Sequence, residues 1–493
     1  MTGKLGPTDI PDIVAADEVP AWDRETDVIV IGQGLAGTCA ALEAHRAGAD
    51  VLVVERASGG GGASAMSSGI FYLGGGTEVQ QACGYDDTPD EMAKFLSASC
   101  DPLDPGAVRA FADDCPDHFR WLEAQGVPFE RSSYKGKAVY LLTTECLMYT
   151  GNEKVWPYSE VARPAARGHK CAGAGENAGI AAMTPLLQRC EDEGVPAIYD
   201  SAVVALIQDR DGRVVGVKVK QPGATLCIRA RRAVIIAAGS HNLNPELIAQ
   251  HIPEMPEIAV GLGIPSNDGM GVRLGMSAGA ATSAMDGLIP TASIYPPADL
   301  IKGIIVNKLG QRFVAEDSYH GRTANFIKEQ PDQKAYLIVD SEIFAYPEMT
   351  AHQHRLIDGY ETIEEMEAGL ALPAGSLVRT MADYNRDVSA GEDRFLHKAA
   401  EWLKPLDSGP YAAFDISFDS SIYFFITLGG IRTGVNGEAL DIRGEAIPGL
   451  YAVGASAAHI PRTGKAYASG LSLGPGSYFG RRAGRHAAGA NFT

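Results

Sequence analysis

Hydrophobic runs of strand length and a helical segment alternate near the start of the chain. Residues 26–31 are apolar and β-branched, residues 38–47 are rich in alanine and leucine with no breaker before Gly48, and residues 50–55 are apolar again. This pattern predicts a buried strand, a helix and a second buried strand. The sequence therefore predicts a βαβ unit with two parallel strands.

A glycine-rich turn joins the first predicted strand to the helix. It has the order Gly-x-Gly-x-x-Gly, with glycines at 32, 34 and 37, and Glu55 ends the next strand. In such a turn Gly32 permits the tight bend, Gly34 lets a pyrophosphate approach the backbone, and Gly37 lets the helix pack on the strand. The helix N-terminus favours the phosphate charge, and Glu55 accepts hydrogen bonds from the ribose. We expect a bound dinucleotide, FAD, and find no second fingerprint that would support an NAD(P)H site.

The middle of the chain continues the mixed pattern. Residues 88–125 are mainly helical in pattern, and residues 202–207, 214–217 and 233–239 are strand-like and apolar. Residues 132–158 are irregular and rich in aromatic side chains. That segment either walls an apolar site or is a packed insertion.

The character of the sequence changes twice more towards the C-terminus. Residues 285–420 carry more charge and fewer glycines, whereas 428–434 and 447–454 return to short, glycine-rich, strand-like runs. The predicted fold class is α/β with an α+β cap, in which a Rossmann-like FAD-binding domain holds an inserted smaller catalytic domain. The predicted limits are 1–284 and 421–493 for the FAD domain, with the cap between them.

Composition narrows the possible partners. The 493 residues carry a formal net charge of −19, which disfavours nucleic acid and anionic membranes. No apolar run approaches the ~18 residues of a membrane span, and the first 20 residues resemble no targeting signal, so we expect a cytoplasmic protein. The eight cysteines form no CxxC pair, which argues against iron–sulfur, zinc and disulfide frameworks. We expect no metal.

Several motifs together resemble the fumarate reductase and succinate dehydrogenase flavoprotein family over most of the chain from Asp27. They are the Gly32 loop with Glu55, the strand that ends at Gly239, Asn267-Asp268-Gly269, Gly310-Gln311-Arg312-Phe313, Gly429-Gly430 and the IPGLYAVG run at 447–454. The resemblance implies extended FAD, with its adenine end on the Rossmann part and its isoalloxazine ring facing the cap. The residues expected at the cofactor are Gly32, Gly34, Leu35, Ala36, Gly37, Glu55, Arg56, Ala57, Gly62, Ala63, Ser64, Ser67, Ser68, Gly69, Ala202, Val203, Ala238, Gly239, Asn267, Asp268, Gly454, Ser472 and Leu473.

One departure from this family concerns cofactor attachment. Members with covalent FAD use a histidine in the serine- and glycine-rich segment after the acidic residue. No histidine occurs here between His45 and His118. We therefore expect noncovalent FAD.

A second departure concerns the substrate. Fumarate reductases hold two carboxylates with arginine and histidine, and an arginine shortly after the GxRFxxE turn delivers a proton. Here Tyr319 follows that turn, and residues 463–470 offer hydroxyls where a cationic clamp is expected. The pattern indicates a small, neutral, apolar substrate. With tyrosines at 319 and 467 the chain is similar to the 3-ketosteroid dehydrogenases, and its Tyr-Ala-Ser-Gly at 467–470 is most similar to the Δ4-(5α) type.

This resemblance implies a set of roles in the removal of two hydrogens beside a ketone. Tyr467 donates a hydrogen bond to the C3 carbonyl together with a backbone N–H near Gly470. Ser469 takes the C4 proton and passes it through Tyr319 towards solvent, with Tyr319 acting directly as the rival assignment. A helix that starts near Pro475 is expected to point its N-terminus at the flavin and favour its anionic reduced form.

Three other functions stay open at this stage. They are Δ1-dehydrogenation of a 3-ketosteroid, reduction of fumarate or another enoate, and a non-enzymatic role as a flavin redox carrier or sensor. An enzyme of this class also needs an external electron acceptor, which the sequence does not identify.

Overall fold

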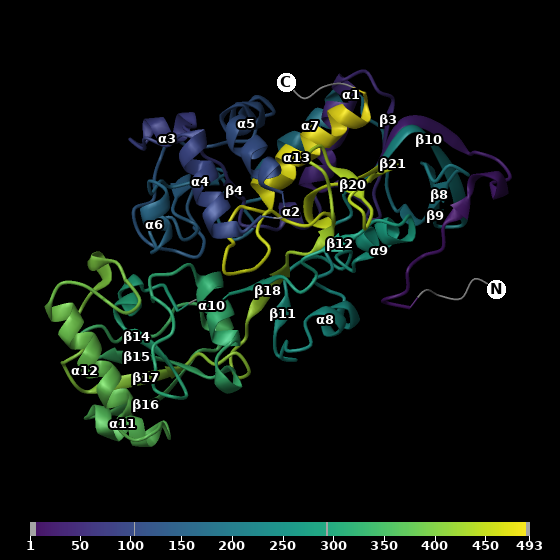
Figure 1. Cartoon of the computed structure of the whole chain (residues 1–493). Helices are drawn as coiled ribbons and strands as arrows, with labels where there is room; N and C mark the ends of the chain where they lie inside the picture. The colour runs from purple at the N-terminus through teal and green to yellow at the C-terminus, as the bar shows by residue number, and fades with distance from the viewer. Residues whose placement is uncertain (1–5, 103, 292–293, 490–493) are drawn as a thin grey trace.

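A nine-stranded sheet is the centre of the computed structural model, which describes residues 6–102, 104–291 and 294–489 (Figure 1). Strands β2 (Arg24–Ile31) and β3 (Val51–Val54) are parallel neighbours, joined by helix α1 (Leu35–Arg46). The predicted βαβ unit is therefore confirmed. On the far side of β3 lies β7 (Ala197–Ile198), and β1 (Val14–Ala15) forms the opposite edge.

Strand β10 (Ala224–Ile236) links two kinds of pairing in this sheet. Its first half pairs antiparallel with β9 (Val214–Gln221), which in turn pairs antiparallel with β8 (Ala202–Gln208). Its second half runs parallel to β2 and β21 (Ala446–Ala452). The short strand β20 (Glu438–Leu440) pairs with β21. The sequence pattern predicted a strand only from residue 233, because the polar outer face of 224–232 hides the apolar alternation.

Helix α13 (Leu473–Ala487) crosses α1 closely, as Figure 1 shows. A Cβ added at Gly480 would lie 2.4 Å from the Ala36 carbonyl oxygen, and one at Gly484 would lie 2.2 Å from that of Ala40. Only glycine therefore permits this backbone approach. The contact brings the N-termini of both helices to the same side of the sheet.

A helical layer and a small sheet fill the chain between β3 and β7. The elements are α2 (Gly62–Ala65), β4 (Ile70–Tyr72), α3 (Glu78–Ala82), α4 (Pro89–Cys100), α5 (Pro105–Ala124), β5 (Leu147–Met148), α6 (Tyr158–Val161), β6 (Gly168–Lys170) and α7 (Ile180–Asp192). The helical stretch expected at 88–125 is two helices, because Asp101 adopts a left-handed φ of 42° between them.

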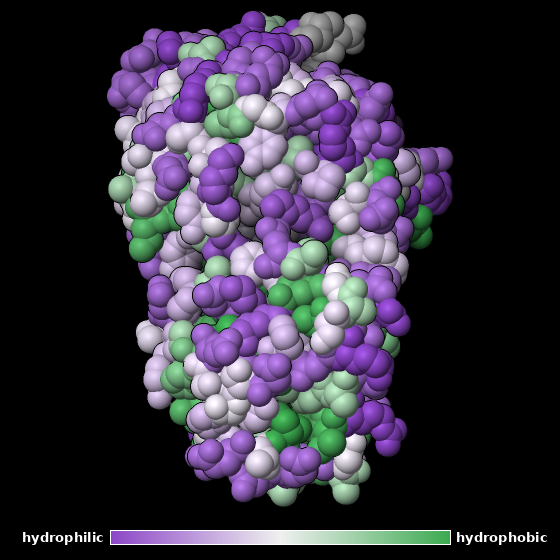
Figure 2. Space-filling model, turned by 90° about the vertical axis from the view of Figure 1, so that its left-hand side faces the viewer, coloured by the Kyte–Doolittle hydropathy of each residue, from purple (hydrophilic) through white to green (hydrophobic). Residues whose placement is uncertain are grey.

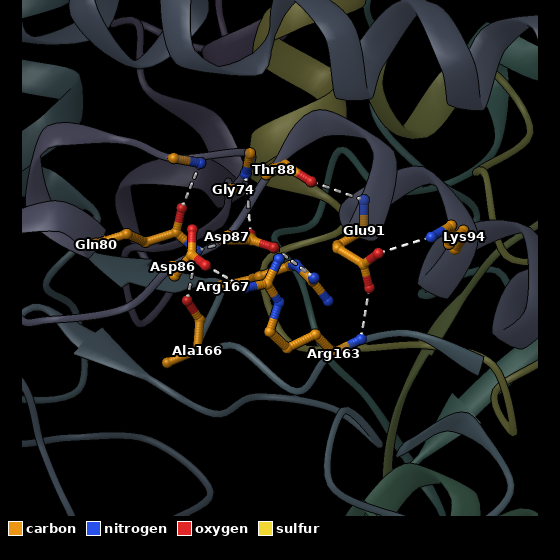
Figure 3. A network of polar contacts seen from close by, with 12 residues as sticks. Gly74, Gln80, Asp86, Asp87, Thr88, Glu91, Lys94, Arg163, Ala166 and Arg167 are labelled. Atoms are coloured by element: carbon orange, nitrogen blue, oxygen red, sulfur yellow. Dashed lines mark hydrogen bonds and ion pairs between the residues drawn. The ribbon is translucent and has the colours of Figure 1, made fainter. Parts of the chain in front are cut away.

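A buried ion pair ties this layer together (Figure 3). Arg167 donates to Asp87 through Nε at 3.0 Å and Nη2 at 2.7 Å, and both side chains are fully buried. Asp87 also accepts from the Gly75 amide and from Gln80. Burial raises the pKa of Asp87, but the hydrogen bonds and charge of Arg167 outweigh it and hold that pKa below its ordinary value.

The cap, drawn at the lower left of Figure 1, has a hydrophobic core of its own. This core packs between a sheet with the order β14 (Ile304–Asn307), β15 (Ala335–Asp340), β17 (Tyr411–Asp415) and β16 (Arg355–Tyr360) and the helices α10 (His320–Lys328), α11 (Ile363–Gly369) and α12 (Ser376–Ser389). The buried apolar side chains of this core run from Ile294 to Tyr423. We retain 285–420 as the proposed limits of the capping domain.

Short strands connect the cap with the central sheet. They are β11 (Val260–Gly261), β13 (Leu288–Pro290) and β18 (Phe424–Thr427) in one group and β12 (Thr282–Ser283) with β19 (Gly430–Ile431) in another. In chain order, α8 (Pro245–His251) precedes β11, and α9 (Met270–Ser277) lies between β11 and β12.

The face of the molecule shown in Figure 2 is largely hydrophilic, with hydrophobic residues in separate patches. Among the described helices none is long and apolar enough to cross a membrane. All eight cysteines are free thiols. Within the described ranges no cluster of three or more His, Cys, Asp or Glu side chains could hold a metal ion.

Candidate active site

A cavity of about 720 Å³ runs from the carboxyl ends of β2, β3 and β10 to the cap. The first turns of α1 and α13 both line it, through Leu35 and Leu473 among others. Two helix N-termini therefore direct their positive ends at one space, which favours an anionic ligand. The volume lies within the range of cofactor sites.

Two of the three glycines in the first turn have the predicted structural roles, and the third leaves space for a ligand. Gly32 has a φ of 99°, and a Cβ there would lie 2.4 Å from the Ala237 carbonyl oxygen. A Cβ at Gly37 would lie 2.1 Å from the Gly32 oxygen, so this glycine serves helix packing. At Gly34 the nearest atom would be Ser64 Oγ at 3.7 Å, which leaves open space on the cavity side. That space is where a phosphate can approach the backbone.

Glu55 lies buried at the end of β3 and faces the same cavity. Its Oε2 accepts from the Gln33 amide at 2.7 Å, and its Oε1 accepts from the Ala57 amide at 2.8 Å. These bonds fix the carboxylate in one orientation, while each oxygen keeps a further lone pair for a ligand hydroxyl.

Most residues predicted at the cofactor line this cavity. They are Gly32, Gly34, Leu35, Ala36, Glu55, Arg56, Gly62, Ala63, Ser64, Ser67, Ser68, Val203, Ala238, Gly239, Asn267, Gly454, Ser472 and Leu473. The other five, Gly37, Ala57, Gly69, Ala202 and Asp268, are not part of the lining. Asp268 instead forms an ion pair with Arg56 at 2.7 Å, and a Cβ at Gly69 would lie 2.5 Å from Cys171 Sγ.

All four predicted catalytic residues line the cavity together. The hydroxyls of Tyr319 and Ser469 are 2.8 Å apart, and the rings of Tyr319 and Tyr467 have centroids 6.4 Å apart. Gly470 has a φ of 101°, and a Cβ there would lie 2.4 Å from the Tyr72 nitrogen. The loop at 467–470 therefore depends on glycine to lie flat against β4.

Buried ion pairs hold Tyr319 at the start of α10. Just before this helix, Arg312 bonds to Glu316 at 2.8 Å, and it also bonds to Asp393, which follows α12, at 2.9 Å. Burial raises the pKa of Tyr319 well above its ordinary range, and burial also raises that of Tyr467. Both phenols are therefore neutral near pH 7, able to donate one hydrogen bond and accept others.

Sequence reasoning missed Asn152, which connects the two catalytic segments. Its Oδ1 accepts from the Tyr319 amide at 3.0 Å, and its Nδ2 donates to the Lys465 carbonyl at 3.4 Å. Two residues earlier, the Thr150 carbonyl accepts from the Ser469 amide at 2.8 Å. The aromatic segment 132–158 thus packs against the site and also contributes Val139 and Tyr140 to the cavity wall. No motif signals these contacts, which only the fold creates.

The wall near the cap is mostly apolar and was also missed. It consists of Ile289, Thr291, His320, Met349, Ala351, His352, Phe424 and Ile426. Burial lowers the pKa of His320 to about 3, so this ring is neutral. No arginine or lysine lines this part of the cavity among the described residues, since Arg56 is the one such side chain in the wall and lies beside Glu55.

Comparisons with known proteins agree with this geometry. A family model described as "FAD binding domain" matches residues 27–469. A crystal structure of the 3-ketosteroid Δ4-(5α)-dehydrogenase from Rhodococcus jostii RHA1 in complex with 4-androstene-3,17-dione is similar at 40% identity and a TM-score of 0.90. That similarity covers 97% of this chain and 99% of the other.

Two curated proteins are similar at lower identity. The 3-oxo-5-alpha-steroid 4-dehydrogenase of Comamonas testosteroni is 27% identical over 90% of this chain and 95% of its own length. The probable fumarate reductase Ifc3 of Shewanella frigidimarina is 26% identical over 87% of this chain and 69% of its own length.

Proposed function

Because the chain belongs to the FAD-binding family of fumarate reductase-type flavoproteins, we propose that it dehydrogenates a 3-ketosteroid and introduces a C4–C5 double bond. The chain is a member of an FAD-dependent oxidoreductase family, and its cofactor is FAD. The cavity fits that cofactor, with open space at Gly34 and the oriented carboxylate of Glu55 at one end. No histidine lies between Glu55 and Ile70, which supports noncovalent attachment.

The observation that carries the proposal is the arrangement of Tyr319, Ser469 and Tyr467 in an apolar wall without a cationic clamp. A dicarboxylate would require buried positive charge at this end of the cavity. A neutral ketone requires only hydrogen-bond donors at its oxygen. The similarity to two proteins named for Δ4 dehydrogenation of 3-ketosteroids supports the same choice.

The chain's own residues divide the chemistry as follows. When bound, FAD would supply at N5 the acceptor for the hydride that leaves C5, while the C4 proton goes to the protein and the C4–C5 double bond remains. Tyr467 donates a hydrogen bond to the C3 carbonyl, joined by the Gly470 amide, and so stabilises the developing enolate oxygen. Ser469 removes the C4 proton and shares it with Tyr319 across 2.8 Å. Since neutral hydroxyls are weak bases, this transfer depends on the polarised ketone to acidify the C–H bond.

The test uses purified, FAD-loaded protein, a 5α-3-ketosteroid and a dye as external electron acceptor. We expect dye reduction and a 4-ene-3-ketone product. Dye reduction no faster than in a steroid-free control would refute ketosteroid dehydrogenation, and a 1-ene product would select the Δ1 alternative.

The remaining alternatives have their own measurements. Reoxidation of the reduced protein by fumarate would support an enoate reductase. If Tyr467→Phe left the rate of flavin reduction by steroid unchanged, Tyr467 would have no catalytic role, and failure of every substrate would leave a redox carrier or sensor. We propose a cytoplasmic enzyme of steroid degradation whose physiological electron acceptor comes from outside the chain.

A further inference from the structure

A row of three hydrogen-bonding groups leads away from the main cavity. Tyr467 Oη lies 2.9 Å from Ser472 Oγ, and Ser472 Oγ lies 3.3 Å from His459 Nε2. The other ring nitrogen of His459 lies 3.1 Å from the Leu428 carbonyl oxygen. Ser472 is one of the residues expected at the cofactor, whereas no motif of the sequence points to His459.

His459 and Ser472 also line a second cavity, of about 210 Å³, behind the first. Its wall includes Asp104, Arg432 and Phe479 as well. The row therefore connects the hydroxyl proposed to hold the ketone with a separate space on the other side of the α13 N-terminus.

The direction of the hydrogen bonds in this row follows from its far end. The Leu428 carbonyl can only accept, so Nδ1 of His459 carries a hydrogen. Nε2 of a neutral ring then offers a lone pair, which the Ser472 hydroxyl satisfies by donating to it. Ser472 Oγ in turn accepts from Tyr467. In this state the only hydrogen of Tyr467 is engaged, so the hydroxyl has none to donate into the cavity.

A ketone oxygen also only accepts, so this direction is wrong for binding it. The row must reverse, with Ser472 donating to Tyr467 and Tyr467 donating into the cavity. That reversal leaves the lone pair of a neutral His459 without its donor. A single proton taken up at Nε2 removes the conflict, because Nε2–H then donates to Ser472 and both hydroxyls keep their own hydrogens.

We propose that His459 is a positioning residue for this site: proton uptake at its Nε2 reverses the row and turns the Tyr467 hydroxyl into a donor towards the ketone. The inference rests on the proposed function only for the identity of the ligand. The proton comes from solvent through the second cavity and returns there when the ligand leaves, so no net proton is consumed.

The charged and titratable surroundings of His459 are few. Tyr467 lies on the same loop, His241 approaches from the segment after β10, and Asp104 and Arg432 stand at the second cavity. Burial lowers the pKa of His459, so the free protein holds the neutral ring near pH 7. Ligand binding is therefore expected to take up a proton.

The experiment measures proton uptake when a 4-ene-3-ketosteroid binds to the oxidised holoenzyme, by titration calorimetry in buffers of different ionisation enthalpy at pH 7. We expect uptake that approaches one proton per ligand in the wild type and none in His459→Gln. Ser472→Ala, which keeps the histidine but breaks the row, is also expected to abolish uptake. His486→Gln is the matched control, because His486 also bonds a tyrosine hydroxyl, Tyr451 at 2.9 Å, and lines neither cavity.

Nitrogen-15 NMR of the histidines gives a readout that needs no ligand. We expect the His459 ring to be neutral with the hydrogen on Nδ1 and an Nε2 shift that moves in Ser472→Ala. Unchanged proton uptake in His459→Gln, or a hydrogen on Nε2 of the free neutral ring, would overturn the proposal. Failure of any ketosteroid to bind would instead refute the proposed function, and the NMR result would still decide the direction of the row.

Discussion

The hydroxyls of Tyr319 and Ser469 lie 2.8 Å apart, although 150 residues separate them in the chain. Tyr319 precedes α10 in the cap, whereas Ser469 belongs to the loop before α13 in the FAD-binding part. The proposed proton transfer therefore takes place across the junction of the two parts. Asn152, from a third segment, holds the junction by bonding to the backbone on both sides.

This pair predicts strongly non-additive effects of mutation. Ser469→Ala and Tyr319→Phe should each lower the rate of flavin reduction by a 5α-3-ketosteroid by ~10²–10⁴-fold, with little change in steroid affinity. The double variant should be hardly slower than the slower single one, since both act on the same proton. Stopped-flow reduction measures the rates, and Tyr149→Phe, outside the cavity lining, is the control. Additive losses would show that the two hydroxyls act separately.

Two glycines of the same turn should behave differently when each is replaced by alanine. Gly37→Ala forces a Cβ to within 2.1 Å of the Gly32 oxygen and should destabilise the protein by at least ~1–3 kcal/mol. Gly34 has a φ of −75°, and an added Cβ would meet open space, so Gly34→Ala should fold normally. Its methyl group would occupy the space proposed for the phosphate, and FAD affinity should fall about tenfold or more, equivalent to ~1.4 kcal/mol. Denaturant unfolding and flavin titration separate the two effects. Equal stability losses in both variants would contradict this assignment.

The buried Arg167–Asp87 pair predicts a large cost for removing one partner. Arg167→Met leaves the Asp87 carboxylate buried without its countercharge and should lower the free energy of unfolding by ~3–5 kcal/mol. The control is Arg109→Met, because Arg109 pairs with Asp90 and Asp113 at the surface and should cost less than ~1 kcal/mol. A comparable loss in the two variants, measured by denaturant unfolding, would show that burial is not the cause.

Buried histidines predict acid sensitivity. His169 donates from Nδ1 to the Arg167 carbonyl and accepts at Nε2 from Thr77, and burial lowers its pKa from 6.5 to about 4. Between those values the unfolded chain binds a proton that the native state does not. Stability is therefore fully present above pH 6.5 and falls as the pH drops towards 4, by up to ~1.4 kcal/mol per pH unit for each such group.

The measurement is the free energy of unfolding at pH 7 and pH 5. His169→Gln should reduce the difference between the two, because it removes a group whose pKa burial lowers. An identical pH dependence in His169→Gln and the wild type would assign the acid sensitivity to other groups.

The βαβ unit could be predicted from sequence because its determinants are local. The apolar runs at β2 and β3, the glycines at 32, 34 and 37, and Glu55 all lie within about 30 residues. Local sequence was less informative where the polar face of β10 masks a strand, and where Asp101 divides the helical stretch at 88–125. Family motifs point to Tyr319, Tyr467 and Ser469 as site residues. Because Tyr319 is far from the other two in the chain, the sequence does not show how close their side chains lie in space.

The sequence by itself determined the dinucleotide site and the types of side chain available for chemistry, because glycine conformation and strand periodicity are encoded over a few neighbours. Only the tertiary structure decided which side chains meet. The hydrogen bond between Tyr319 and Ser469 and the bridge through Asn152 join segments that packing brings together, whereas the row from Tyr467 to His459 is close in the chain and meets a distant segment at the Leu428 carbonyl. Such contacts depend on how whole layers dock, which no short stretch of sequence specifies.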